Sequence, residues 1–173
     1  MKHGMGIVSL AILMMGAHQP DNLAGEWELV ADASTPVDPF RNLALEVRLE
    51  SASVVIVRTW MGSDNIRGVD SLRVVPGDVA QTVPMLSWLD NRHLGVRVDT
   101  DSTRQVSAHW KDDNRTLAVE QQMMVASSQG ATPLRIYSEY RSTPDGNTLE
   151  VIELRSTRPR PMSYVFRRAG GDS

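Results

Sequence analysis

The chain of 173 residues contains no cysteine, so no disulfide can hold it together and its fold must depend on a hydrophobic core. Aromatic residues make up only 5% of it, which argues against a membrane-embedded barrel, because such barrels carry aromatic girdles. Basic residues, 18 in number, are fewer than the 21 acidic ones. Nucleic acid is therefore not expected as a partner, since phosphate binding needs a basic surface.

Motifs of known catalytic chemistry are missing as well. The sequence has no Gly-x-Ser-x-Gly elbow, no Walker loop and no Gly-rich dinucleotide fingerprint. After residue 20 the histidines are His93 and His109, and the aspartates near them have the ordinary explanation that hairpin turns favour aspartate. A metal site needs three or four converging ligands. We therefore expect a protein that is not an enzyme and that holds no metal or cofactor.

An apolar stretch lies at the N-terminus. Residues 7–15 follow Lys2 and lead to the small residues Gly16 and Ala17 and then to a polar segment. This layout is typical of a secretory signal peptide, and the stretch is too short for a permanent membrane span. We expect residues 1–19 to be a cleaved signal peptide and 20–173 to be one secreted or periplasmic domain with a formal charge of −4. The alternative is a buried N-terminal helix.

Three segments share the pattern Asp-x-x-x-Leu-x-Val, at residues 90–96, 113–119 and 145–151. In each, turn residues lead directly into alternating apolar positions, which is the pattern of a hairpin that enters a strand. The sequence therefore predicts an antiparallel β meander.

The rest of the chain reads as about ten short strands without a helix between them. Because an open meander would expose two edges, we expect the strands to close into an up-and-down barrel. Residues 83–89 fit either a strand or a short helical turn. The expected strands are 25–30, 43–49, 54–60, 67–75, 83–89, 94–98, 105–110, 116–125, 133–140, 148–154 and 162–168.

Three short motifs resemble a family of bacterial secreted lipocalin-like domains of uncharacterised function, which have calycin-type β-barrels. They are Gly25-Glu26-Trp27, Asp145-Gly146-Asn147-Thr148-Leu149 and Tyr164-Val165-Phe166-Arg167. The resemblance implies a barrel that opens with Gly25 and Trp27 and in which Arg167 or Arg168 of the last strand packs over the Trp27 ring. A guanidinium over an indole gains cation–π energy and shields the barrel end from water.

Two functions remain open. In the first, the barrel carries a small apolar molecule inside it, and the side chains best suited to line the site are Trp60, Met123, Met124, Tyr137 and Tyr140. In the second, the interior is filled, and the protein is a non-catalytic module of the cell envelope that acts through its surface on a protein or glycan. We expect a monomer in either case. The sequence does not decide which of the two tyrosines points inward.

The N-terminal pattern gives a first prediction. The exported protein begins between about His18 and Asp21 and is recovered in soluble form, because cleavable signal peptides end in small residues before a polar segment. N-terminal sequencing of the exported protein checks this. Recovery of chains that still begin with Met1 from the membrane fraction would contradict it.

Overall fold

Ten β-strands make up most of the computed structural model, which describes residues 21–37, 40–62, 67–85, 102–127 and 130–170. Two single-turn 3-10 helices, η1 (Asp21–Leu23) and η2 (Ala31–Ala33), flank the first strand. Within the described ranges no helix is long and apolar enough to cross a membrane. The strands are β1 (Gly25–Leu29), β2 (Asn42–Glu50), β3 (Ser53–Met61), β4 (Arg67–Val74), β5 (Gly77–Pro84), β6 (Thr103–Lys111), β7 (Thr116–Ser127), β8 (Gly130–Ser142), β9 (Thr148–Arg155) and β10 (Met162–Arg168).

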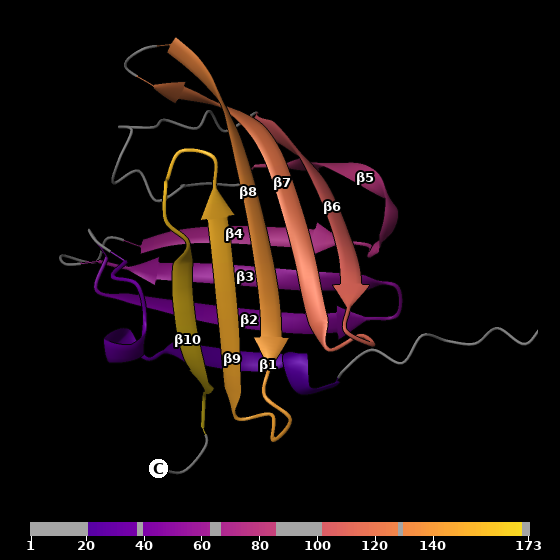
Figure 1. Ribbon diagram of the computed structural model, residues 1–173, viewed down its shortest axis with the longest axis vertical. Coiled ribbons are helices and arrows are strands. Elements are labelled where there is room, and N and C mark those ends of the chain that lie inside the picture. Colours follow the sequence, from indigo (N-terminus) through magenta and orange to yellow (C-terminus); the bar gives the residue numbers. More distant parts are fainter. Residues whose placement is uncertain (1–20, 38–39, 63–66, 86–101, 128–129, 171–173) are drawn as a thin grey trace, which may run out of the picture.

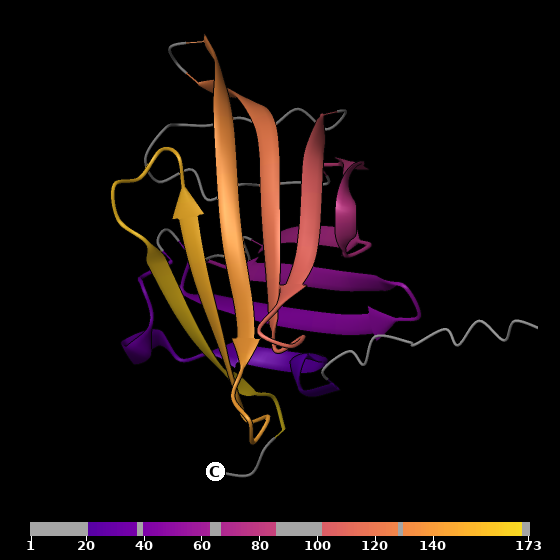
Figure 2. The same cartoon turned by 45° about the vertical axis from the view of Figure 1, so that its right-hand side comes forward.

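The strands form one antiparallel sheet in the order β4-β3-β2-β1-β10-β9-β8-β7-β6-β5. The first strand pairs with the last, and this pairing curls the meander into a nearly closed barrel. In Figure 1, β1 to β4 run across the view behind the steeper β6 to β10, and Figure 2 shows the same crossing from another side. The structure confirms the predicted all-β meander and barrel.

Two of the three predicted hairpin turns lie in the described part of the chain. Between β6 and β7, Asp112, Asp113 and Asn114 have φ of 52°, 55° and 68°, a conformation that short polar side chains tolerate. Between β8 and β9, Gly146 supplies a φ of 70° and the Thr143 amide donates to the Thr148 carbonyl at 2.8 Å. The third segment, residues 90–96, lies outside the described residues.

One strand differs from its predicted position. The sequence predicts no strand between residue 75 and the ambiguous element at 83–89, but β5 already begins at Gly77 and ends at Pro84. Along this strand side chains are mainly exposed, so no apolar alternation marks it in the sequence. A terminal proline is tolerated because, among the described strands, β5 is an edge strand that pairs with β6. The predicted strand 94–98 lies outside the described residues.

The inward-facing side chains form two separate hydrophobic clusters. The larger one, which we call the main core, contains inner residues of nine strands, from Trp27 of β1 to Phe166 of β10. Apart from Met85, which follows β5, the smaller one lies on the halves of β7 and β8 that extend farthest in Figures 1 and 2. We call it the methionine cluster, and it consists of Met85, Met123, Val125, Leu134 and Ile136.

Among the described strands, one seam lacks strand pairing, between β4 and β5. Side chains bridge it instead. The Gln81 amide accepts from the Val75 N–H at 3.0 Å and donates to the Val75 carbonyl at 2.7 Å, much as a neighbouring peptide group would. Farther inside, Arg104 of β6 reaches Asp70 of β4. The barrel is therefore closed by backbone at β1 and β10 and by side chains at the seam.

A single arginine fastens the paired end. The Arg168 guanidinium lies 4.3 Å from the Trp27 ring, and that ring is 1% exposed. Arg168 also donates to the carbonyls of Gly146 at 2.7 Å, Ala24 at 2.8 Å and Asn22 at 2.9 Å. It thereby joins the start of β1, the β8–β9 turn and the end of β10. Arg167 instead lies outside and pairs with Glu28 at 3.3 Å.

Gly25 is required by this arrangement. A Cβ atom at this position would lie 2.2 Å from the Arg168 Nη1 atom, which is too close for any side chain. The residue also has a φ of 138°, which favours glycine. The Gly-x-Trp opening therefore has a physical basis, because the glycine leaves room for the guanidinium that covers the tryptophan.

The closure at this end predicts an order of stabilities. Trp27→Ala should lower the free energy of unfolding by about 3–5 kcal/mol, the usual cost of deleting a buried large aromatic. Arg168→Ala should lower it by about 2–4 kcal/mol, because charged hydrogen bonds to three carbonyls are lost. The control Arg167→Ala should cost less than about 1 kcal/mol, as for other exposed ion pairs. Urea unfolding measures all three, and equal values for the two arginines would contradict the assignment.

Candidate functional site

A layer of polar side chains crosses the inside of the barrel. Along β7 the inner positions run from Val119 of the main core through Gln121 to Met123 of the methionine cluster, so this layer separates the two clusters. Its members come from β3, β4, β6, β7, β8 and β9. We call it the polar layer, and it consists of Arg58, Asp70, Arg104, Gln121, Ser138, Glu153 and Arg155.

Glu153 is the centre of one half of the polar layer and is fully buried. Arg58 Nη1 donates to its Oε2 atom at 2.8 Å from across the barrel, and Arg155 Nε donates to its Oε1 atom at 2.7 Å. The other Arg58 amino group donates to the Tyr140 hydroxyl. Ser138, which faces Glu153 in the β8–β9 register, adds a longer contact of 3.4 Å.

Arg104 is the centre of the other half, with a side chain that is 2% exposed. It pairs with both carboxylate oxygens of Asp70, at 2.9 and 2.8 Å, in a fork-like geometry. Its Nη1 atom also donates to Gln121 Oε1 at 2.8 Å, and its Nη2 atom to the Ser71 carbonyl at 3.2 Å. Asp70 lies opposite Arg58 in the β3–β4 register, which places the two halves side by side.

The charged groups in the polar layer keep one another ionised. Burial alone would raise the pKa of Glu153, but the charges of Arg155 and Arg58 and the hydrogen bonds that they donate lower this pKa from 4.5 to about 2. Burial would lower the pKa of Arg58, yet its partners Tyr140 and Glu153 raise it. The pKa of Tyr140 is raised, chiefly by burial. At neutral pH the layer therefore contains ionised Glu153 and Arg58 beside a neutral Tyr140.

Charged side chains of both signs meet in the polar layer. Three guanidinium groups, those of Arg58, Arg104 and Arg155, face the carboxylates of Asp70 and Glu153. Such an arrangement can bind a strongly polar group. In the described parts of the chain, no group of three or more histidine, aspartate or glutamate side chains is arranged to hold a metal ion.

The predicted ligand-contacting residues divide between the two faces of the wall. Trp60, Met123 and Tyr140 belong to the inner face and are 7%, 6% and 1% exposed. Trp60 packs near Phe40 in the main core, with ring centroids 6.3 Å apart. Met124 is 55% exposed on the outside, which follows from the alternation of a strand.

Tyr137 also faces outward. Its hydroxyl donates to Glu139 at 2.6 Å, and Lys111 donates to the same carboxylate at 2.5 Å. The hydrogen bond from Lys111 is the main cause of the lowered pKa of Glu139. Of the two histidines after residue 20, His109 is exposed on the outer face of β6, and His93 lies outside the described residues. Neither Tyr137 nor His109 is part of the inner face.

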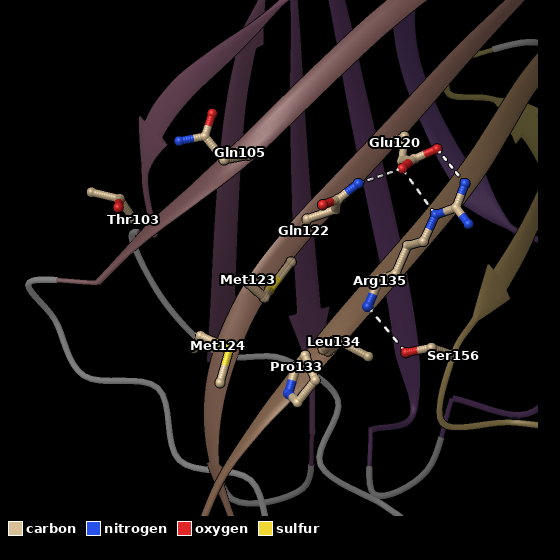
Figure 3. A pocket seen from close by; sticks show the side chains of 10 residues that line it. All are labelled: Thr103, Gln105, Glu120, Gln122, Met123, Met124, Pro133, Leu134, Arg135 and Ser156. Carbon is tan, nitrogen blue, oxygen red and sulfur yellow. Dashed lines mark hydrogen bonds and ion pairs between the residues drawn. The ribbon is translucent and has the colours of Figure 1, made fainter.

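A groove of about 790 Å³ lies on the wall formed by β6, β7 and β8 (Figure 3). Arg135 and Glu120 form an ion pair across it at 2.7 Å, and Gln122 donates to Glu120 at 2.7 Å. The hydrogen bond from Arg135 lowers the pKa of Glu120. The groove combines polar groups with the exposed thioether of Met124. It is therefore the candidate for a site at which the surface of the protein contacts a partner.

Sequence reasoning did not find the polar layer. One signal was available, because Arg58 has the same strand parity as the apolar Ile56 and Trp60, and Glu153 the same parity as Leu149 and Val151. Charged residues at inward positions indicate a buried ion pair once the register is known. Their partners come from distant strands, however, and the sequence does not show which charges meet.

No protein-family model matches the chain. No curated protein matches it in sequence. Among solved structures it is similar to the crystal structure of secretory abundant heat soluble protein 4 from Ramazzottius varieornatus, at 10% identity and a TM-score of 0.46, over 87% of this chain and 97% of that chain. A TM-score at this level supports no inference about function. The structure confirms the antiparallel barrel expected from the sequence, whereas the resemblance to a family of bacterial secreted lipocalin-like domains stays a prediction.

The polar layer makes the stability of the protein depend on pH. A carboxyl group whose pKa is lowered by folding stabilises the protein at pH values above the pKa that it has in the unfolded chain, near 4.5. This contribution disappears as the pH falls towards the folded pKa of about 2. For Glu153 it amounts to about 3 kcal/mol at neutral pH. Glu153→Gln should therefore be strongly destabilised at pH 7, and its difference from the wild type should shrink between pH 4.5 and 2.

Urea unfolding over this pH range measures the effect. Glu28→Gln is the matched control, because Glu28 is 52% exposed in its pair with Arg167. A Glu153→Gln deficit that stays constant from pH 7 to pH 2 would show that the ionised carboxylate is not the stabilising form.

Proposed function

We propose that the chain is exported and that its barrel binds a small, mainly apolar ligand in its interior, without metal or covalent chemistry. The observation that carries this proposal is the methionine cluster, which stays separate from the main core on the inner face of β7 and β8. Thioether side chains are flexible and polarisable, so they adapt to ligands of irregular shape. Export rests on the apolar segment 7–15 and on the small residues that follow it.

The barrel wall is suited to this role. Small-molecule sites are mostly apolar with a few fixed polar groups, and antiparallel barrels of moderate size can enclose one ligand. Here the inner face offers Met123 and Ile136 beside Gln121 and Arg104 of the polar layer. A ligand in this position would contact apolar side chains on one side and find hydrogen-bond donors on the other.

The second candidate is a module that acts through its surface on a protein or glycan. The groove on β6 to β8 favours it, because the groove presents the ion pair of Glu120 and Arg135 together with the exposed Met124 (Figure 3). The two candidates involve opposite faces of the same wall, but Met123 and Leu134 of the methionine cluster line the groove as well. Ile136, which is buried and outside the groove lining, and the exposed Met124, which lines the groove, therefore distinguish them.

Ligand binding should be assayed with fatty acids, isoprenoids and environment-sensitive apolar dyes, through fluorescence and the shift of the melting temperature. A bound compound at a hundred times its dissociation constant should add about 2.7 kcal/mol to the free energy of unfolding. Ile136→Ala should weaken binding roughly ten-fold or more, because a buried isoleucine contributes about 1.5–3 kcal/mol of apolar contact. The matched control Met124→Ala, on the outer face, should bind like the wild type.

Two outcomes would contradict interior binding. In one, no compound of the panel changes fluorescence or the melting temperature. In the other, Met124→Ala weakens binding while a folded Ile136→Ala does not, and the groove then becomes the site. Circular dichroism of both variants shows whether the barrel is intact.

A further inference from the structure

The turn between β6 and β7 carries a sequence signal that the proposed function does not use. Of all the asparagines in the chain, Asn114 alone is followed two positions later by a serine or threonine, namely Thr116. The pattern Asn-x-Ser/Thr, with a residue other than proline in the middle, is the acceptor signal for N-glycosylation of exported proteins. Asp112 stands two positions before Asn114, and an acidic residue there belongs to the longer form of the signal that bacterial oligosaccharyltransferases require.

The fold places this signal on an exposed hairpin turn, as expected for an acceptor of N-linked sugar. Residues 112–115 connect β6 to β7 at the lower end of β6 in Figure 1. Asn114 is partly exposed, and its neighbours Asp113 and Arg115 are exposed. A glycan at this position would lie among exposed residues at one end of the barrel, so the packed interior would not have to change.

The contacts of the turn indicate when a transferase can recognise it. Thr116 is buried, and its hydroxyl donates to Asp112 Oδ2 at 2.9 Å. The Arg115 N–H donates to the Lys111 carbonyl at 3.1 Å and closes the turn. The threonine hydroxyl by which a transferase recognises its acceptor is therefore engaged in the folded hairpin. Recognition requires a chain in which this hairpin has not yet formed, as during export of an unfolded protein.

The turn between β8 and β9 offers a comparison within the same chain. Asp145 and Asn147 are exposed and have the same spacing as Asp112 and Asn114. The residue two positions after Asn147, however, is Leu149, which has no hydroxyl. The two turns therefore share the acidic residue and the asparagine and differ in the group that marks an acceptor.

We propose that Asn114 is an N-glycosylation site of the exported protein. The co-substrate is an oligosaccharide on a polyprenyl diphosphate carrier, and an oligosaccharyltransferase of the membrane carries out the transfer. A bond forms between Asn114 Nδ2 and the anomeric carbon of the sugar, and the bond between this carbon and the diphosphate breaks. The carrier leaves as polyprenyl diphosphate, and Nδ2 gives up one proton to a base of the transferase. The proposal rests on the export proposed above and is independent of ligand binding inside the barrel.

The test is expression of the full chain in bacterial cells that contain an oligosaccharyltransferase facing the periplasm and its undecaprenyl-diphosphate oligosaccharide. Mass spectrometry of the processed protein should show the added mass of one oligosaccharide, and peptide mapping should place it on Asn114. A processed, exported chain without added mass would overturn the proposal and leave export intact. A chain that stays in the cytoplasm and still begins with Met1 would overturn both.

Variants then test the signal itself. Asn114→Asp removes the amide but tolerates the left-handed backbone with its φ of 68°, so the variant should fold and lose the glycan. Thr116→Val has nearly the same shape without the hydroxyl and should also lose the glycan, whereas Thr116→Ser should keep it. The matched control Asn147→Asp, in the other turn, should be glycosylated like the wild type. Circular dichroism shows which variants are folded, and a Thr116→Val protein that keeps the glycan would overturn the assignment.

Discussion

Burying guanidinium groups inside a barrel imposes the strongest constraint on this structure. Removing an ion from water costs several kcal/mol, and only a nearly complete set of well-placed partners offsets it. Arg58 meets its partner Glu153 across the barrel, and Arg104 meets Asp70 across the unpaired seam. Both contacts join strands that share no backbone pairing. We infer that they fix how the two crossing sets of strands are placed relative to one another.

The two regions of the interior differ in mechanical character. Around Trp27, one arginine binds three carbonyls and covers a fully packed ring, so little movement is possible there. Around Met123 the side chains form a small cluster of their own, which includes two thioethers, the side-chain type that adapts most readily to irregular shapes. The polar layer separates these regions, which places any adaptation to a ligand on the methionine side and leaves the rigid side to maintain the fold.

The fold class could be predicted from the sequence because it depends on local patterns, namely alternation along strands and turn residues at Asp113 and Asp145. β5 could not be predicted, since an exposed edge strand needs no apolar alternation. Predicting which of Tyr137 and Tyr140 points inward requires the strand register. Predicting the polar layer requires more than the register, because the partners of Arg58 and Arg104 depend on how the barrel closes in three dimensions.

The pairing of β1 with β10 has a consequence for how the chain folds. Ala24 and Arg168, which it brings into contact, are separated by 144 residues. Closing so long a loop is entropically unfavourable until intervening segments have become ordered, whereas each hairpin of the meander closes only a short one. The sheet can therefore grow hairpin by hairpin, with the joining of its ends as the late step. Until that step, the edge of β1 and the edge of β10 are both open to other chains, so the barrel is most exposed to aggregation just before it closes.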